Sequence, residues 1–428
     1  MDTRPRRPRP PAPRPALADL PLWSLLLLLL LPPPGAPSDS TPAPSPQSRP
    51  ANLDSDALHL GSHGRLGPVL NMTFDLTKVT RATSYFDLRT WDPEGVVFYG
   101  DTDPNLDWFL LGLREGRAEI QINNPHAQVT VAGGPKLNDG KWHRMEVTNK
   151  QDMVLLAIDG DEVLTLRQVS KPLAGAPLPL MKIALGNLLF PPSKLRLPLV
   201  PSLDACLRRS IWLDVPLASV SPPPTRRSPL RACEPDPGPG AYFPSGSEAQ
   251  FALRDLGPPG ADPWNFTVEL GLRLVGEGGP TRILAFGTPD GDPLLSLHLQ
   301  NQAFVLSAGP GPGPGRARLA RGPGVRAAPL VLRLGPAAAW LRLGPREAAL
   351  PLPPPRFAAV AALWEQPHGA LLLGPGPGSD PRASPAAFCL ERLLAQGQAL
   401  DPDRARSLSD AIWSHSCPRN PENATQIP

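Results

Sequence analysis

The sequence predicts an all-β protein built from two tandem antiparallel β-sandwiches of the jelly-roll type. Its 62 prolines and 38 glycines make up nearly a quarter of the 428 residues, and this composition disfavours helices and favours short strands joined by turns. From Met72 onward, apolar and polar residues alternate in short runs, as they do in half-buried strands. The second half of the chain then repeats motifs of the first half.

Strands are expected where an alternating run lies between turn residues. Asp159-Gly160, between VLLAI and DEVLTL, is a favourable two-residue hairpin turn. The expected strands of the first sandwich include residues 85–90, 96–99, 108–113, 119–123, 142–147 and 154–158. This density of short strands is typical of an antiparallel sandwich. Near the end of the chain a helix is expected, N-capped by Asp401 with Pro402 at its first position.

Motifs recur at intervals of about 180 residues, which indicates a duplicated module. Gly100 in VVFYG aligns with Gly287 in ILAFG, 187 residues later, and CLRR at Cys206 matches CLER at Cys389, 183 residues later. Four cysteines allow three connectivities. Because each copy has a cysteine pair near its end, the duplication favours local pairing of Cys206 with Cys233 and of Cys389 with Cys417.

The N-terminus has the features of a secretory signal peptide over residues 1–37. Arginines precede an apolar run from Leu20 to Leu31, and small residues follow near Ala36. The alternative is a membrane anchor, but this 12-residue run is shorter than the ~20 residues that span a bilayer. We therefore expect a secreted, extracellular protein with paired cysteines. Glycosylation sequons fit that route and lie at Asn71, Asn265 and Asn423.

Composition also suggests the domain boundaries. Residues 38–68 are rich in proline, serine and alanine and are expected to form a flexible segment. The first sandwich is expected over residues 69–232, a linker over 233–240, the second sandwich over 241–417 and a tail over 418–428. The net charge of +3 is too small to predict a nucleic-acid partner. No second apolar stretch of membrane-spanning length follows the signal.

The sequence lacks the patterns of common catalytic sites. Its seven histidines are scattered without HExxH spacing, the cysteines are assigned to disulfides, and there is no GxSxG or phosphate-binding loop. His143 follows Trp142 in an expected strand and is interpreted as a structural histidine. We therefore predict that the protein is not an enzyme.

Strand periodicity draws attention to three polar residues. Side chains two positions apart share one face of a strand. Ser84, Asp107 and Asn124 each lie at the end of an otherwise apolar face. The apolar members of these faces are Phe86, Leu88, Phe109, Leu111, Leu113, Ile120 and Ile122. From the residues alone, the simplest interpretation is that the strands end there and the polar groups meet water.

Longer motifs carry a family resemblance. WDPEGVVFYG, DWFLLGLREGRAEIQI and KLNDGKWHRMEV resemble the laminin G-like module. Residues 72–215 are similar to the ligand-binding module of the tandem laminin G-like steroid carriers, through MTFDLTK, RTWDPEG, FYGDT, LRQVS, LRLPLVP and CLRR. Ordered similarity extends to Cys417. The resemblance implies a plasma carrier that binds androgens and oestrogens non-covalently in its first module and regulates free sex steroid.

The resemblance also implies roles for individual residues. The serine matched by Ser84 bonds the oxygen on steroid ring A, and the residues matched by Asp107 and Asn124 hold the hydroxyl on ring D. Phe109 and Met181 match apolar residues that line the pocket. Burying ~400 Å² of such a ligand at ~25 cal/mol/Å² supplies about 10 kcal/mol. The polar ends then choose among steroids, and the implied ligands are dihydrotestosterone, testosterone and oestradiol.

One residue departs from the family pattern. Asn149 shares a strand face with Met145 and Val147, where the family often places an apolar residue near the ligand. We expect Asn149 to lower steroid affinity or to shift the preference among steroids.

Metal binding is also implied by the resemblance. Asp92 and Glu94 match carboxylates that bind a structural calcium together with a backbone carbonyl near Ser202, and hard oxygen ligands suit that ion. The alternative is a solvated β-turn. Zinc is not expected, because the loops that hold the family's zinc histidines read NNPHAQ and KPLAGAPLPL here, with His126 as an off-register candidate.

The resemblance also implies self-association, and one competing function stays open. Family members pair through exposed strands of their first modules, which implies a homodimer with Val131 and Leu164 as interface candidates. Both are also ordinary apolar strand positions. The second sandwich lacks convincing counterparts of the three polar residues and is assigned no ligand. The competing hypothesis is a matrix or receptor-binding laminin G protein that acts with calcium and takes up no steroid.

Overall fold

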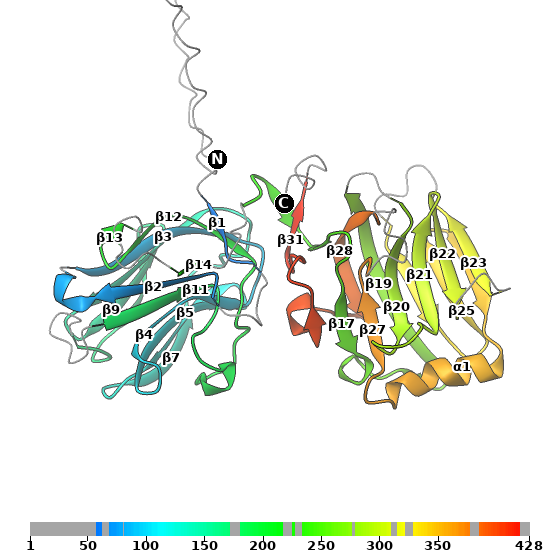
Figure 1. Ribbon diagram of the computed structural model, residues 1–428, viewed down its shortest axis with the longest axis horizontal. Helices are drawn as coiled ribbons and strands as arrows, with labels where there is room; N and C mark the ends of the chain where they lie inside the picture. The colour runs from blue at the N-terminus through cyan, green and yellow to red at the C-terminus, as the bar shows by residue number, and fades with distance from the viewer. Residues whose placement is uncertain are drawn as a thin grey trace, which may run out of the picture. The chain divides into compact units, whose positions relative to one another are not determined.

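The computed structural model describes residues 57–61, 68–79, 81–171, 180–216, 225–226, 233–275, 279–309, 315–321, 328–376 and 385–419. These residues form two antiparallel β-sandwiches, each with two facing sheets (Figure 1). The predicted fold class is therefore confirmed. The expected signal peptide, the C-terminal tail from residue 420 and the sequon at Asn423 lie outside the described residues.

One sheet of the first sandwich has the order β1-β12-β3-β8-β9-β10, with β13 paired to β12. Its strands are β1 (Leu58–His59), β3 (Ala82–Thr90), β8 (His143–Lys150), β9 (Met153–Ile158), β10 (Asp161–Leu166), β12 (Ala205–Trp212) and β13 (Val215–Pro216). The facing sheet has the order β14-β2-β11-β4-β5-β6-β7. Its strands are β2 (Leu70–Asp75), β4 (Gly95–Asp103), β5 (Asp107–Arg114), β6 (Arg117–Asn123), β7 (Gln128–Gly133), β11 (Leu180–Leu185) and β14 (Thr225–Arg226). Short 3-10 turns are η1 (Leu76–Lys78) and η2 (Pro192–Lys194).

The core of the first sandwich consists of the residues whose alternation predicts buried strand faces. Phe86 and Leu88 of β3 and Leu111 of β5 are 1% exposed or less and belong to one cluster. Trp212 at the end of β12 stacks on Phe86 with ring centroids 5.3 Å apart. Trp212 and Phe86 are both fully buried in this cluster. The β9–β10 hairpin turns at Asp159-Gly160, as predicted.

The second sandwich repeats the arrangement. Its two sheets have the orders β16-β28-β19-β24-β25-β26 and β23-β22-β21-β20-β27-β17-β30, with β18 paired to β19 and β29 to β28. The first sheet has β16 (Ala241–Phe243), β18 (Gly260–Ala261), β19 (Trp264–Val275), β24 (Leu330–Leu334), β25 (Ala338–Leu343), β26 (Arg346–Pro351), β28 (Ala387–Ala395) and β29 (Gln398–Ala399). The second has β17 (Ala249–Ala252), β20 (Thr281–Gly287), β21 (Leu295–Gln300), β22 (Ala303–Ala308), β23 (Arg316–Ala320), β27 (Ala370–Leu373) and β30 (Ser407–Leu408). The remaining elements are η4 (Leu253–Asp255), α1 (Pro354–Ala361), η5 (Ala362–Trp364) and η6 (Pro402–Arg404).

The prediction of a helix after Asp401 is wrong beyond the first turn. Asp401 does cap the segment, since its Oδ1 accepts from the amide of Asp403 at 2.9 Å, but only the 3-10 turn η6 forms. The amide of Arg406 then donates to the carbonyl of Gln250 at 2.7 Å, and residues 407–408 pair with β17. Pairing with a neighbouring strand therefore replaces the bonds that would continue a helix.

Two segments expected to be flexible or linking contribute strands. Leu58–His59, within the expected flexible segment 38–68, pair with Leu207 and Cys206 of β12. They are held there because Leu60 is fully buried and His59 bonds to Asp204. Pro237–Pro239, within the expected linker, form β15 and pair with β31 (Ser416–Pro418).

The local disulfide pairing is confirmed. Cys206 is bonded to Cys233, and Cys389 to Cys417. Each bridge joins a strand next to the end of its sheet, β12 or β28, to a following segment of the chain.

Candidate functional site: a cavity in the first sandwich

A cavity of about 520 Å³ lies between the two sheets of the first sandwich, within the size range of small-molecule sites. All five residues expected to bind steroid line it, which the alternation alone could not establish. One sheet contributes β3, β8 and β9, and the other contributes β4, β5, β6 and β11. The lining residues used below are Ser84, Phe98, Gly100, Asp101, Asp107, Phe109, Ile122, Asn124, Val147, Asn149, Ser170, Met181 and Leu213.

Ser84 provides a hydroxyl on the β3 side of the cavity. The residue is 5% exposed, and its Oγ accepts from the backbone amide of Leu213 at 3.1 Å. A serine hydroxyl can accept and donate at the same time. The bond from Leu213 therefore fixes the oxygen and leaves the hydroxyl proton available to a ligand.

Asp107 and Asn124 provide polar groups from the opposite sheet. Oδ2 of Asp107 accepts from the hydroxyl of Thr102 at 2.6 Å. Oδ1 of Asn124 accepts from the amides of His126 and Ala127, both at 2.8 Å, while its Nδ2 donates to the carbonyl of Val169 at 2.7 Å. These bonds hold both side chains and leave one amide proton of Asn124 and acceptor sites on Asp107.

Apolar residues form the walls between these polar groups. Phe109 of β5 stacks on Phe98 of β4, with ring centroids 5.4 Å apart. Met181 of β11 lies against Gly100, where an added Cβ would be 2.9 Å from the methionine methyl carbon. Glycine at this position therefore allows Met181 to lie flat beside the cavity.

Asn149 also lines the cavity. Its Nδ2 donates to Oγ of Ser170 at 3.0 Å, while its Oδ1 is buried without a hydrogen-bond partner among the described atoms. A buried carbonyl oxygen of this kind costs free energy unless something donates to it.

Sequence reasoning missed Asp101 and Ser170 as lining residues. Asp101 is 4% exposed, and burial raises the pKa of its carboxyl despite the opposing charge of Lys182. Alternation places Asp101 on the face opposite Gly100, but the pairing of β4 with β5 shifts register between Asp101 and Asp103. Asp101 itself still pairs in register with Trp108, which also lines the cavity, so alternation does not account for its position, and only the FYGDT motif pointed to this stretch.

The whole turn that is expected to bind calcium belongs to the described part of the chain. Asp92 is completely buried; its Oδ1 accepts from the amide of Glu94 at 3.0 Å and its Oδ2 from the amide of Asp204 at 2.9 Å. The Ser202 carbonyl is next to the turn, since a Cβ on Gly95 would be 2.0 Å from it.

The Glu94 carboxylate has two arginine partners. It pairs with Arg404 at 3.0 Å and with Arg114 at 3.7 Å. Calcium on Asp92 and Glu94 therefore stays a prediction that requires Glu94 to exchange these guanidinium groups for the ion.

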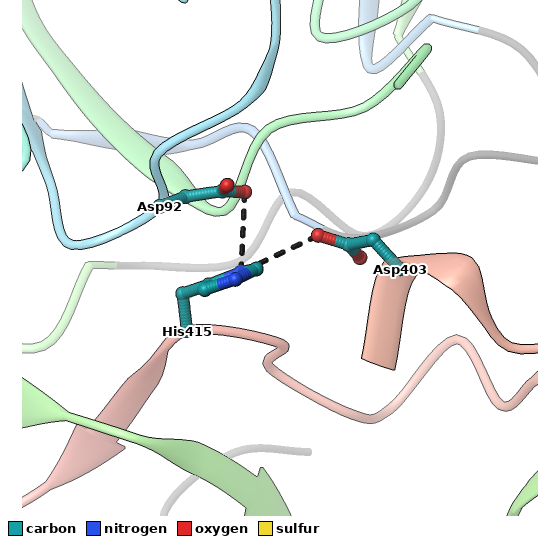
Figure 2. Close-up of side chains that lie close together, drawn as sticks. All are labelled: Asp92, Asp403 and His415. Carbon is teal, nitrogen blue, oxygen red and sulfur yellow. Dashed lines mark ion pairs between the residues drawn. The ribbon is translucent and has the colours of Figure 1, made fainter. Parts of the chain in front are cut away.

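Asp92 instead faces His415 and Asp403 (Figure 2). Burial alone would lower the pKa of His415, but the Asp92 and Asp403 carboxylates raise it well above its usual value. Burial, together with nearby Asp92, raises the pKa of Asp403 to about 7.

The remaining candidates are two histidines and two apolar residues of the first sandwich. His143 bonds to Asp159 at 2.7 Å and to Asp139 at 3.1 Å, as a structural histidine does. His126 is exposed at the cavity. Val131 lies on β7 and Leu164 on β10, which are the end strands of their sheets; both are half-buried.

The two described sequon residues differ in accessibility. Oδ1 of Asn71 is buried within β2, whereas the side chain of Asn265 donates to the carbonyl of Pro263 in an exposed turn. Glycosylation at these positions stays a prediction.

Comparison with known proteins defines the class. A family model for the laminin G domain matches residues 88–218. Domains LG4-5 of the mouse laminin alpha1 chain match the structure with a TM-score of 0.57 and 18% identity, covering 85% of this chain and 94% of that one. The chain is a tandem laminin G-like protein.

Full-length relatives define the family. Sex hormone-binding globulin of Crocuta crocuta is 49% identical over 382 residues, covering 89% of this chain and 93% of the relative. The protein of that name from Homo sapiens is 49% identical over 372 residues, covering 87% and 89%. The chain therefore belongs to the sex hormone-binding globulin family. Within the described part of the chain, no helix has the length and apolar character needed to cross a membrane.

Proposed function

We propose that the protein is a secreted, non-enzymatic carrier that binds androgens and oestrogens in the cavity of its first sandwich and so regulates free sex steroid. The observation that carries this proposal is the ~520 Å³ cavity lined by all five expected residues. Its walls are apolar and its polar groups come from both sheets. A steroid, which is rigid and has a polar atom at each end, matches that distribution.

Each polar residue has a role in this proposal. Ser84 donates its hydroxyl proton to the oxygen on ring A, because Leu213 already occupies one of its acceptor sites. Asp107 accepts from the ring D hydroxyl, and the remaining amide proton of Asn124 donates to the same oxygen. The partners that hold these side chains reduce the entropy lost on binding.

The experiment that tests this function is equilibrium dialysis of the full-length protein with radiolabelled dihydrotestosterone. We expect saturable binding that unlabelled testosterone and oestradiol displace. Absence of saturable binding, together with calcium-dependent adhesion to glycans or a receptor, would favour the competing matrix-binding function and overturn the carrier.

Asn149 is expected to limit affinity. Replacing it with methionine, Asn149→Met, removes the unpaired buried oxygen and presents an apolar surface to the steroid. Because an unpaired buried polar group costs ~1–3 kcal/mol, dihydrotestosterone binding should tighten about tenfold in the same dialysis assay. Asn149→Gln keeps a neutral amide and serves as the control, with no gain expected. Equal affinity of Asn149→Met and the unmodified protein would contradict this role.

The proposal includes four further properties of the family: calcium binding, dimerisation, glycosylation and export. A structural calcium binds Asp92, Glu94 and the Ser202 carbonyl after Glu94 leaves Arg404. Two chains pair through edge strands β7 and β10, with Val131 and Leu164 in the interface. The chain is glycosylated and exported through its N-terminal signal.

A further inference from the structure

A cluster of three ionisable side chains lies outside the cavity and has no part in steroid binding. Asp92 comes from the turn between β3 and β4, Asp403 from η6, and His415 from the segment before β31 (Figure 2). Asp92 is fully buried, and the side chain of Asp403 is 3% exposed. One candidate ligand atom from each residue lies within 4.8 Å of the other two.

The spacing is longer than that of ordinary hydrogen bonds. Nδ1 of His415 lies 3.4 Å from Oδ2 of Asp92 and 3.3 Å from Oδ2 of Asp403, whereas N–H···O bonds are about 2.7–3.2 Å long. Ligand atoms about 2.0–2.1 Å from a tetrahedral zinc ion are roughly 3.4 Å apart. The two distances are therefore compatible with two edges of such a tetrahedron, and the third pair of ligand atoms lies within 4.8 Å.

Asp403 supplies an independent observation. Both of its carboxylate oxygens are buried without a hydrogen-bond partner among the described atoms, although buried polar groups are normally bonded. Figure 2 shows this carboxylate directed toward His415. A cation between Asp403 and Asp92 would satisfy these oxygens and balance two acidic groups that share one imidazole.

The surrounding groups contact two of the three ligands. The amides of Glu94 and Asp204 hold the Asp92 carboxylate. Nε2 of His415 faces Oδ1 of Asp401 at 3.7 Å, and a carboxylate near the second ring nitrogen is common among metal-bound histidines. Oγ of Ser414 lies 3.1 Å from Nδ1 of His415. This hydroxyl or a water is available for a fourth position.

We propose that Asp92, Asp403 and His415 form a binding site for a zinc-like divalent transition metal ion. One imidazole and two carboxylates suit such an ion, whereas calcium takes oxygen ligands alone. The site shares only Asp92 with the proposed calcium site. Asp92 and Asp403 are 311 residues apart in the sequence, so the ion would tie the C-terminal segment to the β3–β4 turn.

The test titrates the full-length, chelator-treated protein with zinc chloride in competition with a chromophoric chelator. We expect one zinc ion per chain at this site and a higher melting temperature. Cobalt(II) should give the visible absorption of a four-coordinate ion. His415→Gln and Asp403→Asn should weaken zinc binding at least tenfold and remove the cobalt band. His368→Gln, at an exposed histidine of the second sandwich, is the matched control and should change neither.

Two further comparisons distinguish loss of this zinc site from misfolding and from loss of the calcium site. Asp403→Asn is nearly isosteric and removes a buried charge, so the variant should fold and its zinc loss reports the ligand. Glu94→Gln should lose only the calcium response, and Asp92→Asn both responses. The proposal is overturned if the unmodified protein binds no zinc, or if His415→Gln and Asp403→Asn bind it as tightly as the unmodified protein.

Discussion

Ser84→Leu is expected to weaken dihydrotestosterone binding by about 100-fold or more without unfolding the first sandwich. The change removes the hydroxyl donor, which leaves the ring A oxygen unpaired at ~1–3 kcal/mol. The larger side chain also occupies part of the cavity, so the steroid cannot reach its full depth. Together these effects exceed the ~2.7 kcal/mol that corresponds to 100-fold. Folding should survive because the added atoms enter a space of about 520 Å³ rather than a packed core.

Companion variants separate the causes in the same dialysis measurement. Ser84→Ala removes the hydroxyl without filling the cavity and should cost about tenfold, although the Leu213 amide also loses its acceptor. Asp107→Ala removes the acceptor on the opposite sheet and should weaken steroids that carry a ring D hydroxyl. Ser193→Leu, at an exposed residue of η2, is the matched control and should bind normally. Unchanged affinity in both Ser84→Leu and Asp107→Ala would refute the assignment of the cavity.

The regular strands could be predicted from sequence because their alternation is uninterrupted. β3 runs without a break from Ala82 to Thr90, so Ser84 necessarily shares the face of Phe86 and Leu88. Alternation and capping rules fail where a strand departs from regular alternation or pairs with a segment that is distant in the sequence. Asp101 lines the cavity although alternation assigns it to the other face of β4, and the residues after η6 form a strand because β17 offers partners to their backbone.

The contacts of Asp92 and Glu94 could not be predicted from the sequence. The motif WDPEG predicts the turn and two acidic side chains, and both are present. Which groups meet these side chains depends on segments more than 300 residues away in the chain, since His415 faces Asp92 and Arg404 pairs with Glu94. No periodicity or spacing encodes such contacts, so the arrangement of this site required the folded structure.

Asp204→Ala is expected to lower the free energy of unfolding by ~3–5 kcal/mol, because several buried hydrogen-bond donors would lose their acceptor at once. The side chain is 1% exposed and accepts from Nε2 of His59 at 3.0 Å. It also accepts from the amides of His415 and Ser416 at 2.9 Å each, and from the Ser416 hydroxyl at 2.8 Å. Although burial raises the pKa of Asp204, His59 and these donors lower it to about 2, so the carboxylate is ionised. Alanine would leave all of these donors buried and unpaired.

Chemical denaturation of the disulfide-intact protein measures this loss. Asp204→Asn retains an acceptor oxygen but no charge, so it should lose roughly half as much free energy, mostly at His59. Asp290→Ala, at an exposed aspartate in the β20–β21 turn, is the matched control and should stay within ~0.5 kcal/mol of the unmodified protein. Because Asp204 binds His59 on β1 of the first sandwich and Ser416 near the end of the second, its loss should destabilise both halves. A shift no larger than that of Asp290→Ala would show that water replaces the carboxylate at little cost.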